Sequence, residues 1–571
     1  MFLYFAANVS NLKAELDITK NKEFYLTFLP NFHNNWTNPT DRLRKGDSIY
    51  IFIYAALPTK GTIDFKDVYG NSYSENFDIP DPTKIFVFKK PAYDYALRGF
   101  NLSGNTSSSN HNEKITDFSY HIKADLPIQV YGHSQATLTS ESFNVLPVES
   151  LGNDYFVLSY NSNVLNHTIG QRTPSQFAVV ATEDDTEIEI IPSVPTHLNG
   201  LDTQRVTLNR GEVYLVQALT MGFDPDLSRS IVSSNKPIAV FSGQQRTKIP
   251  ISLQGGRTSR DFICEQMPPL DSWSNEAVVV PFPEPSRYER VSYANDLLRV
   301  IAAYDNTELY VENILLTTLN RGEIYETDLT IPMHIMANAP IMAAGYKRSS
   351  GINETADSDF YRGDPLLQII PTPNQYGESY RFITIQSYER PSGSSIATKI
   401  YDEHNIAVIA LPENIPSLLL DGQPLNPTIF KTVMGSNYRY AHIRITEGTH
   451  IMTGDYPFGL FVCGYGNANS YGYFCGVVSK RDDYEPPELQ SNVDCFESEG
   501  IVTDKKLKSI SAPQNFRTNV DVQLEQFNPY VEEAKFSAKL LNNYLDGKYR
   551  IIAIDSVGQK PRKILTFRDL Q

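Results

Sequence analysis

Short stretches in which apolar and polar residues alternate, or in which β-branched and aromatic residues follow one another, make up most of the chain. Examples are DSIYIFIYAAL from Asp47, TEIEIIPS from Thr186 and RYAHIRI from Arg439. Turn-forming residues separate these stretches, with 35 Pro and 32 Gly supplying many of them. Because successive side chains of a strand point to opposite faces, this pattern predicts an all-β protein. Only brief helical turns are expected, and the segment 531–541, VEEAKFSAKLL, is the one other helix candidate.

The chain repeats itself, and an eight-residue string is the clearest sign of it. TLNRGEVY occupies residues 207–214 and TLNRGEIY occupies residues 318–325. Each copy follows an Asp-rich hairpin turn and precedes an apolar strand that begins at a proline. Asn-Arg-Gly is typical of a turn whose glycine, Gly211 or Gly322, takes the left-handed conformation. We therefore interpret the string as scaffold rather than as a chemical site.

The proline-led strand occurs four times along the chain. Its prolines are Pro127, Pro237, Pro340 and Pro457, and its glycines are Gly132, Gly243, Gly345 and Gly464. Each glycine is expected to end its strand and let the chain turn out into a loop. The repeats predict four related β-units within residues 1–480, at about 22–145, 146–262, 263–366 and 367–480. A repeat of this length fits a small sandwich of about seven strands, or two fused propeller blades.

A different composition begins after the fourth unit. Residues 481–490 read as a charged, proline-containing linker, and residues 491–571 form a segment of the size of one small sandwich. Within it, DGKYRIIAIDSVGQ at 546–559 resembles the closing hairpin of bacterial Ig-like or fibronectin-like surface modules. An Ig-like β-sandwich is expected here.

The net charge and the hydropathy of the chain limit the classes of function that are expected. The formal net charge of −16 argues against nucleic acid as a partner, because such binding depends on Lys and Arg neutralising phosphates. No run of 18 apolar residues is present, so no membrane-spanning helix is expected. The opening stretch MFLYFAANVS is too short for a signal peptide, so any export signal is not visible in the chain.

Few residues have the spacing that chemistry requires. The histidines show no metal-ligand spacing, and no CxxC pair is present. Cys463 and Cys475 bracket a short loop and could form a disulfide, or both could be buried free thiols. Asp357, Asp359 and Asp364 lie on one acidic loop that could hold calcium, although a solvated acidic loop is the alternative. No other cofactor and no catalytic residue is expected.

The loops expected after the four glycines are the candidates for ligand recognition. Equivalent positions in repeated units fall on the same side of each unit, so these loops could form one composite surface. Tyrosine, asparagine and glycine in the fourth loop are residues that recognition loops favour. The candidate residues are His133, Gln245, Arg246, Lys347, Arg348, Tyr465, Asn467 and Tyr471.

Several strings, in order, resemble the IgGFc-binding protein N-terminal domain family over about residues 20–480. They are EFYLTFLPNF, FAVVATEDDTEIEI, VTLNRGEVY, VSSNKPIAVFSG, CEQMPPLDSW, GDPLLQIIP and GYGNANSYGY. Family members often carry another cysteine shortly before the one matching Cys264, and this chain has none there. The resemblance implies a secreted or cell-surface, non-enzymatic binding or adhesion protein whose ligand is an extracellular protein or glycan. The alternatives are a secreted glycan-active enzyme on a propeller-like scaffold and a structural spacer.

Overall fold

The computed structural model divides the chain into two compact units, Met1–Val478, which we call the body, and Ser479–Gln571, the C-terminal module. Each is described by itself. Among the described residues, no helix is long and apolar enough to cross a membrane. The structure describes residues 21–32, 47–99, 110–136, 138–164, 172–221, 223–252, 259–285, 295–350, 363–385, 387–389, 398–467, 469–476, 487–494, 496–514, 517–527, 531–555 and 562–567.

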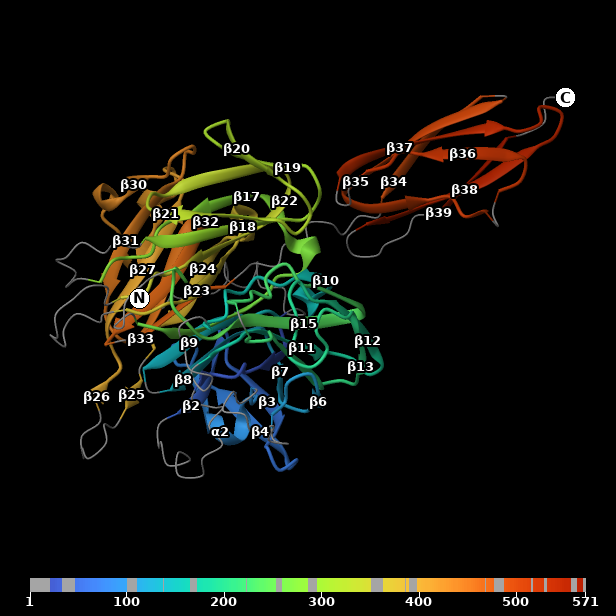
Figure 1. The fold of residues 1–571 in the computed structure, drawn as a ribbon. Helices are drawn as coiled ribbons and strands as arrows, with labels where there is room; N and C mark the ends of the chain where they lie inside the picture. The colour runs from blue at the N-terminus through green and yellow to red at the C-terminus, as the bar shows by residue number, and fades with distance from the viewer. Residues whose placement is uncertain are drawn as a thin grey trace. The chain divides into compact units, whose positions relative to one another are not determined.

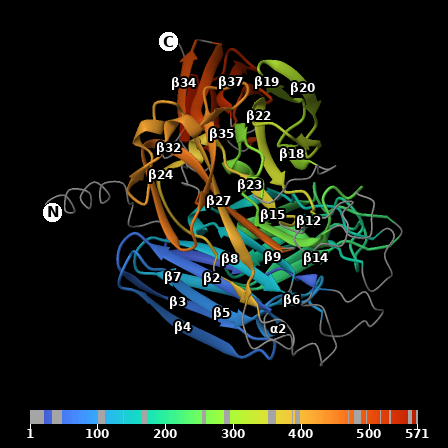
Figure 2. The ribbon, with the colours of Figure 1, turned by 90° about the vertical axis from the view of Figure 1, so that its left-hand side faces the viewer.

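The first unit of the body is a sandwich of two four-stranded antiparallel sheets, and Figure 2 shows β3, β4 and β7 side by side in blue. The first sheet has the order β1 (Glu23–Thr27), β7 (Ser119–Ala124), β3 (Thr59–Lys66), β4 (Ser72–Ile79). The second has the order β5 (Phe86–Pro91), β2 (Ser48–Ala55), β8 (Ile128–Ala136), β9 (Thr139–Val145), and a short helix, α2 (Ala92–Tyr95), follows β5.

The second unit repeats this topology, except that one long strand, β15 (Ile231–Thr247), takes the place of β7 and β8 and belongs to both sheets (Figure 1). Its first half lies between β10 (Gly152–Phe156) and β12 (Thr186–Ile191), and β13 (Gln204–Leu208) forms the edge. Its second half lies between β11 (Ser175–Ala181) and β16 (Asp261–Gln266), with β14 (Val213–Gln217) and the two-residue β6 (Ile115–Thr116) beyond β11.

The third and fourth units share this plan. The third consists of β17 (Ser274–Val279), β18 (Asp296–Ala302), β19 (Thr307–Val311), β20 (Ile314–Leu319), β21 (Ile324–Leu329), the long strand β22 (Met333–Tyr346) and β23 (Leu367–Ile370). The fourth consists of β24 (Gly377–Ile383), β27 (Tyr401–Ala410), β28 (Leu419–Leu420), β29 (Gln423–Pro424), β30 (Lys431–Thr432), β31 (Arg439–Ile445), the long strand β32 (Thr449–Gly466) and β33 (Asn469–Phe474), with a small hairpin of β25 (Tyr388–Glu389) and β26 (Thr398–Lys399). Single 3-10 turns are η3 (Val148–Ser150), η5 (Leu270–Ser272), η7 (Pro373–Gln375), η8 (Ile415–Ser417) and η9 (Pro427–Ile429).

The all-β prediction is confirmed, and the strand pairing makes each unit a sandwich rather than a pair of propeller blades. Because β16 and β23 pair with the long strands of the second and third units, those units run a few residues further than the sequence boundaries at 262 and 366.

The repeated string forms the expected turn in both copies. Gly211 has φ 79° and Gly322 has φ 75°, the left-handed conformation that glycine adopts without steric cost. Ahead of these glycines, the backbone N–H of Arg321 donates to an aspartate of the preceding hairpin turn at 2.9 Å, and Arg210 does the same at 3.0 Å. The turns also dock on the preceding unit, since the Arg321 guanidinium lies 5.1 Å from the centre of the Phe156 ring. Turn geometry and packing between units therefore account for the string.

The four strand-end glycines lie inside their strands, so the expectation that each ends its strand is wrong. Their φ angles are not left-handed, and each faces a residue of the last strand of its unit. A Cβ on Gly132 would lie 2.3 Å from the ring of Phe143, and one on Gly464 would lie 2.1 Å from the ring of Tyr471. Glycine is needed at these two positions because a ring fills the space of its missing side chain.

The C-terminal module is a sandwich in which β35 (Glu497–Ser511) belongs to both sheets. Its first half lies between β34 (Glu488–Val493) and β37 (Val531–Leu540), with β36 (Val520–Leu524) at the edge, and its second half pairs with β38 (Gly547–Asp555), next to β39 (Arg562–Phe567). The helix candidate VEEAKFSAKLL is wrong, because Ala534, Phe536, Ala538 and Leu540 alternate into the core of this module as strand β37.

Candidate functional site

The last strands of the four units, β9, β16, β23 and β33, meet inside the body, and we call this meeting place the hub. Ser140 of β9 donates its backbone N–H to Asp261 of β16 at 2.7 Å and its hydroxyl to the carbonyl of Ser470 of β33 at 3.0 Å. The backbone N–H of Leu367 of β23 donates to Glu141 of β9 at 3.1 Å. The hub therefore links all four units.

Two buried glutamates satisfy backbone groups of the hub strands. Glu141 accepts the N–H of Leu367 at 3.1 Å and that of Gly472 at 3.2 Å, which belong to two other units. Glu265 of β16 likewise accepts backbone hydrogen bonds from β9 and β23. Burial raises the pKa of both carboxyl groups well above their ordinary value. A hub strand pairs with only one neighbour, so these carboxyls replace the ladder partners that it lacks.

Most of the side chains that the sequence predicts for recognition are buried. The exposed fraction is 0% for His133, 1% for Gln245, 3% for Lys347, and 0% for Tyr465 and Tyr471. The prediction of a composite loop surface from these residues is wrong. Strands β8, β15 and β32 continue past their glycines and carry the following residues into the interior, and Lys347, directly after the end of β22, is buried against Asp296.

Three of these buried residues have internal hydrogen bonds. The His133 Nδ1 lies 2.9 Å from a serine hydroxyl, and burial lowers the pKa of this histidine to about 3. The Tyr465 hydroxyl donates to the Pro283 carbonyl at 2.8 Å. The Tyr471 hydroxyl lies 2.9 Å from the Nδ1 of His404. These contacts fit a structural role for the three side chains.

The basic candidates are also partnered. The Lys347 Nζ lies 3.2 Å from the Oδ1 of Asp296, and Arg348 makes two hydrogen bonds, of 3.0 and 2.9 Å, to the carboxylate of Glu284. The half-buried Arg246 lies over the ring of Phe32, 4.7 Å from its centre. Asn467 is the one predicted recognition residue that is exposed.

Cys463 and Cys475 are free thiols, so the disulfide prediction is wrong. Cys463 lies opposite Gly472 in the β32–β33 pair, and Cys475 is three residues beyond that glycine. An odd offset along a strand places side chains on opposite faces. The two sulfurs accordingly belong to different core clusters.

Of the calcium candidates, Asp357 and Asp359 lie outside the described residues, and Asp364 is 1% exposed. Asp364 lies close enough to Asp261 and Arg246 for their charges to interact. Burial raises the pKa of Asp364 to about 7, and that of Asp261 is also raised, by burial and by Asp364. Within the described ranges no three His, Cys, Asp or Glu side chains are grouped as metal ligands. The calcium site remains a prediction.

Asp364 gives the body a pH-dependent stability. Its ordinary pKa is near 4, so between about pH 4 and pH 7 the folded state binds more protons than the unfolded state, and stability falls as pH rises. We expect Asp364→Asn to reduce this slope, because Asp261 still titrates in the variant. The free energy of unfolding of the variant minus that of wild type should rise by on the order of 2 kcal/mol between pH 5 and pH 8. Urea unfolding at several pH values measures the difference. A difference that stays constant with pH contradicts the assignment.

An exposed site lies instead at the loops of the second unit, where Glu113 anchors the segment between β12 and β13. The Glu113 carboxylate accepts hydrogen bonds from the Thr196 hydroxyl at 2.6 Å, the Leu198 N–H at 2.6 Å, the Asn199 side-chain amide at 2.9 Å and the Gln204 side-chain amide at 3.0 Å. Charge-assisted bonds are roughly twice as strong as neutral ones, so a single carboxylate fixes the shape of this segment.

A second segment lies beside it. The His197 N–H donates to the Gln217 carbonyl at 3.1 Å, and the Leu219 N–H donates to the Pro195 carbonyl at 2.8 Å. Residues 217–221, at the end of β14, therefore adjoin residues 195–201, and both adjoin the segment that carries Glu113.

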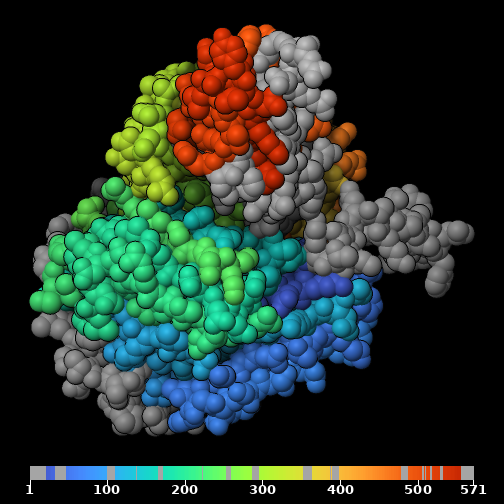
Figure 3. Space-filling view, turned by 90° about the vertical axis from the view of Figure 1, so that its right-hand side faces the viewer, coloured from blue at the N-terminus to red at the C-terminus, as the bar shows by residue number. Residues whose placement is uncertain are grey.

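Large apolar side chains project from these adjoining segments into solvent. Monomeric proteins rarely expose extended apolar patches, and such patches mark sites of protein–protein interaction. Figure 3 looks onto the second unit, in teal and green, above the first unit in blue. We call these residues the loop surface: Ile115 (49% exposed), Leu198 (59%), Leu201 (61%), Met221 (64%) and Phe223 (43%).

The sequence carries a signal for the loop surface that the repeat-based prediction missed. The strings THLNGLD at 196–202 and TMGFDP at 220–225 place large apolar residues among turn formers. Apolar residues in turns have no strand face to bury them, so they are either core anchors or exposed contacts.

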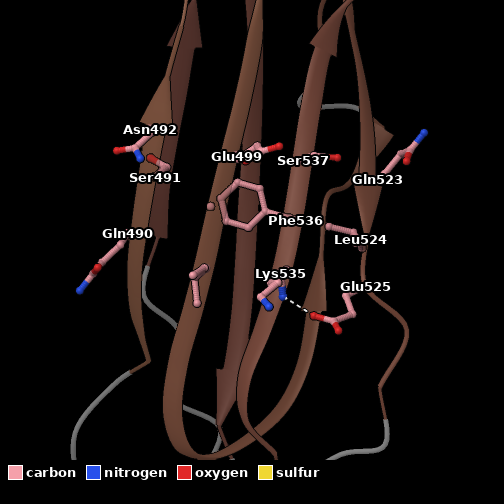
Figure 4. Close-up of a pocket in the computed structure, with 12 residues that line it drawn as sticks. Gln490, Ser491, Asn492, Glu499, Gln523, Leu524, Glu525, Lys535, Phe536 and Ser537 are labelled. Carbon is pink, nitrogen blue, oxygen red and sulfur yellow. Dashed lines mark hydrogen bonds between the residues drawn. The ribbon is translucent and has the colours of Figure 1, made fainter.

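The C-terminal module has a groove of about 660 Å³ across four strands (Figure 4). Amide, carboxylate, amine and aliphatic side chains line it, and Phe536, its only aromatic residue, is 4% exposed and belongs to the core. Its most exposed large apolar side chain is that of Ile501, at 36%, whereas every residue of the loop surface is more exposed than this. Its lining residues are Gln490, Ser491, Asn492, Glu499, Gly500, Ile501, Gln523, Leu524, Glu525, Lys535, Phe536 and Ser537.

Comparisons with known proteins bear on the body. A family model described as IgGFc binding protein matches residues 141–464, from β9 to β32. The IgGFc-binding protein of Homo sapiens is 25% identical over 385 residues, which cover 66% of this chain and 6% of that protein, so the chain spans a small part of its length. A crystal structure of a Salmonella alpha-2-macroglobulin mutant aligns with 97% of this chain and 47% of its own, at 9% identity and a TM-score of 0.12, too low to carry an argument.

Proposed function

The chain belongs to the IgGFc-binding protein family, and from this premise we propose that it is an extracellular, non-enzymatic binding protein that recognises a protein ligand through the loop surface. The exposure of five large apolar side chains on adjoining, hydrogen-bonded loops carries this proposal. Interface cores are rich in aromatic residues and Met, and the loop surface offers both kinds of side chain.

The name of the human relative states what that protein binds, the Fc region of immunoglobulin G. The relative is many times longer than this chain, so its ligand is a proposal here. We propose the Fc region as the first ligand to test.

The proposal includes no catalytic step. Asp261 and Asp364, the carboxyl pair of the hub, are 0% and 1% exposed, so neither reaches a bond of a bound glycan without opening of the surrounding chain. This burial supports a binding role over the glycan-active enzyme alternative. The loop surface also favours a binding protein over a structural spacer, because a spacer needs no exposed apolar side chains to contact a ligand.

We expect Met221→Asp and Leu201→Asp each to weaken binding of immunoglobulin G Fc by about tenfold or more, since a charge placed in an apolar interface must be desolvated on binding. Biolayer interferometry with immobilised Fc measures the affinity of the full chain. Tyr456→Asp is the matched control, because Tyr456 is similarly exposed, at 53%, in the fourth unit. Wild-type protein that does not bind Fc contradicts the proposed ligand, and variants that bind as well as wild type contradict the proposed surface.

A further inference from the structure

Strand β20 of the third unit is an edge strand with unusual side chains. It pairs with β19 on one side, and among the described strands none pairs with its other side. None of its six residues, ILLTTL, is charged. Ile314 is 65% exposed, Leu315 49% and Leu316 38%. An uncharged edge with exposed apolar residues is a template for pairing with another chain.

The equivalent edges of the other three units are protected. On β4 of the first unit, Asp78 pairs with Lys60 at 2.9 Å, and on β13 of the second, Arg205 pairs with Glu189 at 2.5 Å. In the fourth unit β29 has only two residues, one of which is Pro424. Charges, short strands and proline are the means by which proteins block edge-to-edge pairing. The edge strand of the third unit has no charge and no proline, and its one irregularity is a register shift that leaves Leu316 without a partner on β19.

We propose that β20 binds an extended segment of a partner protein, which adds to this sheet as a further strand. Main-chain hydrogen bonds along the free edge would supply affinity, and Leu315 and Leu316 would contact alternate side chains of the segment. This site is separate from the loop surface and goes beyond the proposed function.

The charges near β20 indicate what flanks that segment. Glu308 lies opposite Thr318 in the β19–β20 pair, and Glu312 lies in the turn between the two strands. Together with the net charge of −16, these carboxylates favour a segment flanked by lysine or arginine. The same charge disfavours a second copy of this chain as the occupant, because like charges would face each other.

The probe is a ten-residue peptide of three Val-Thr pairs flanked by two lysines at each end, labelled with a fluorophore and titrated with the full-length protein. Fluorescence anisotropy should report binding to wild type, and Leu315→Lys should weaken it by about tenfold or more. Thr207→Lys, on the protected edge β13, is the matched control and should have no effect. A peptide N-methylated at alternate residues should not bind, since its backbone donors are blocked.

Three results would overturn the proposal. The first is that the peptide does not bind the wild-type protein, and the second is that it binds Leu315→Lys as tightly as wild type. The third is a dimer of the wild-type protein, detected by light scattering, that Leu315→Lys dissociates. This last result would assign the edge to a second copy of the chain. Leu315→Lys should leave Fc binding unchanged, so the two surfaces are tested independently.

Discussion

Replacing Arg299 by Met should lower the free energy of unfolding of the body by about 3–5 kcal/mol, the cost of removing one partner from a buried ion pair. Arg299 is 5% exposed and joins the second and third units. Its Nη1 lies 2.7 Å from Asp226, its Nε lies 2.7 Å from Glu326, and its guanidinium lies over the rings of Tyr160 and Tyr346 at 4.5 and 5.4 Å. Methionine fills a similar volume but leaves the Asp226 carboxylate, 18% exposed, without its cation, whereas Glu326, at 44% exposed, stays hydrated and contributes little to the cost.

Urea unfolding followed by tryptophan and tyrosine fluorescence measures this loss. The double variant Arg299→Met with Asp226→Asn is the control, and it should recover part of the stability because it no longer buries an unpaired charge. A single variant within about 1 kcal/mol of wild type would show that the pair contributes little to the junction between the units.

Gly243→Ala should lower the stability of the body more than Gly345→Ala does, although both glycines occupy the same position in their repeats. A Cβ on Gly243 would lie 1.8 Å from the carbonyl oxygen of Ile263, so the backbone of β16 would have to move. A Cβ on Gly345 would lie 3.2 Å from the Phe282 ring, which can shift. We expect a cost of more than about 3 kcal/mol for Gly243→Ala and about 1 kcal/mol or less for Gly345→Ala.

Thermal unfolding of the two variants, with the yield of folded protein, measures the difference. Equal stability of the two would contradict the close approach of β15 and β16 in the second unit.

Local patterns in the sequence were sufficient to predict the repeat and the strand content. The Asn-Arg-Gly turn needs a left-handed glycine wherever it occurs, so Gly211 and Gly322 could be assigned without knowledge of the rest of the fold. The four proline-led strands likewise predicted four units, because the apolar pattern of each strand can be recognised from neighbouring residues alone.

The function of the four strand-end glycines could not be predicted in this way. A glycine that ends a strand and a glycine that faces an aromatic ring look the same in sequence, and the distinction depends on partners such as Phe143 and Tyr471, which lie several residues away. The error then carried over to the site, since His133 and Lys347 were expected in exposed loops and are buried.

The register between paired strands could not be predicted from the sequence either. Cys463 and Cys475 flank one hairpin, but the pairing of Cys463 with Gly472 puts the two thiols on opposite faces. In contrast, Leu201 and Met221 could have been singled out as candidates for exposed side chains, because large apolar residues among turn formers break the strand pattern around them.

Hydrogen–deuterium exchange of the full chain with and without immunoglobulin G Fc tests the central claim most directly. We predict that Fc slows exchange in peptides covering residues 195–201 and 217–221, and leaves exchange unchanged in peptides covering residues 132–136, which lie in the buried end of strand β8. Protection that appears elsewhere on the body, with no change in the two loop-surface segments, would contradict the account.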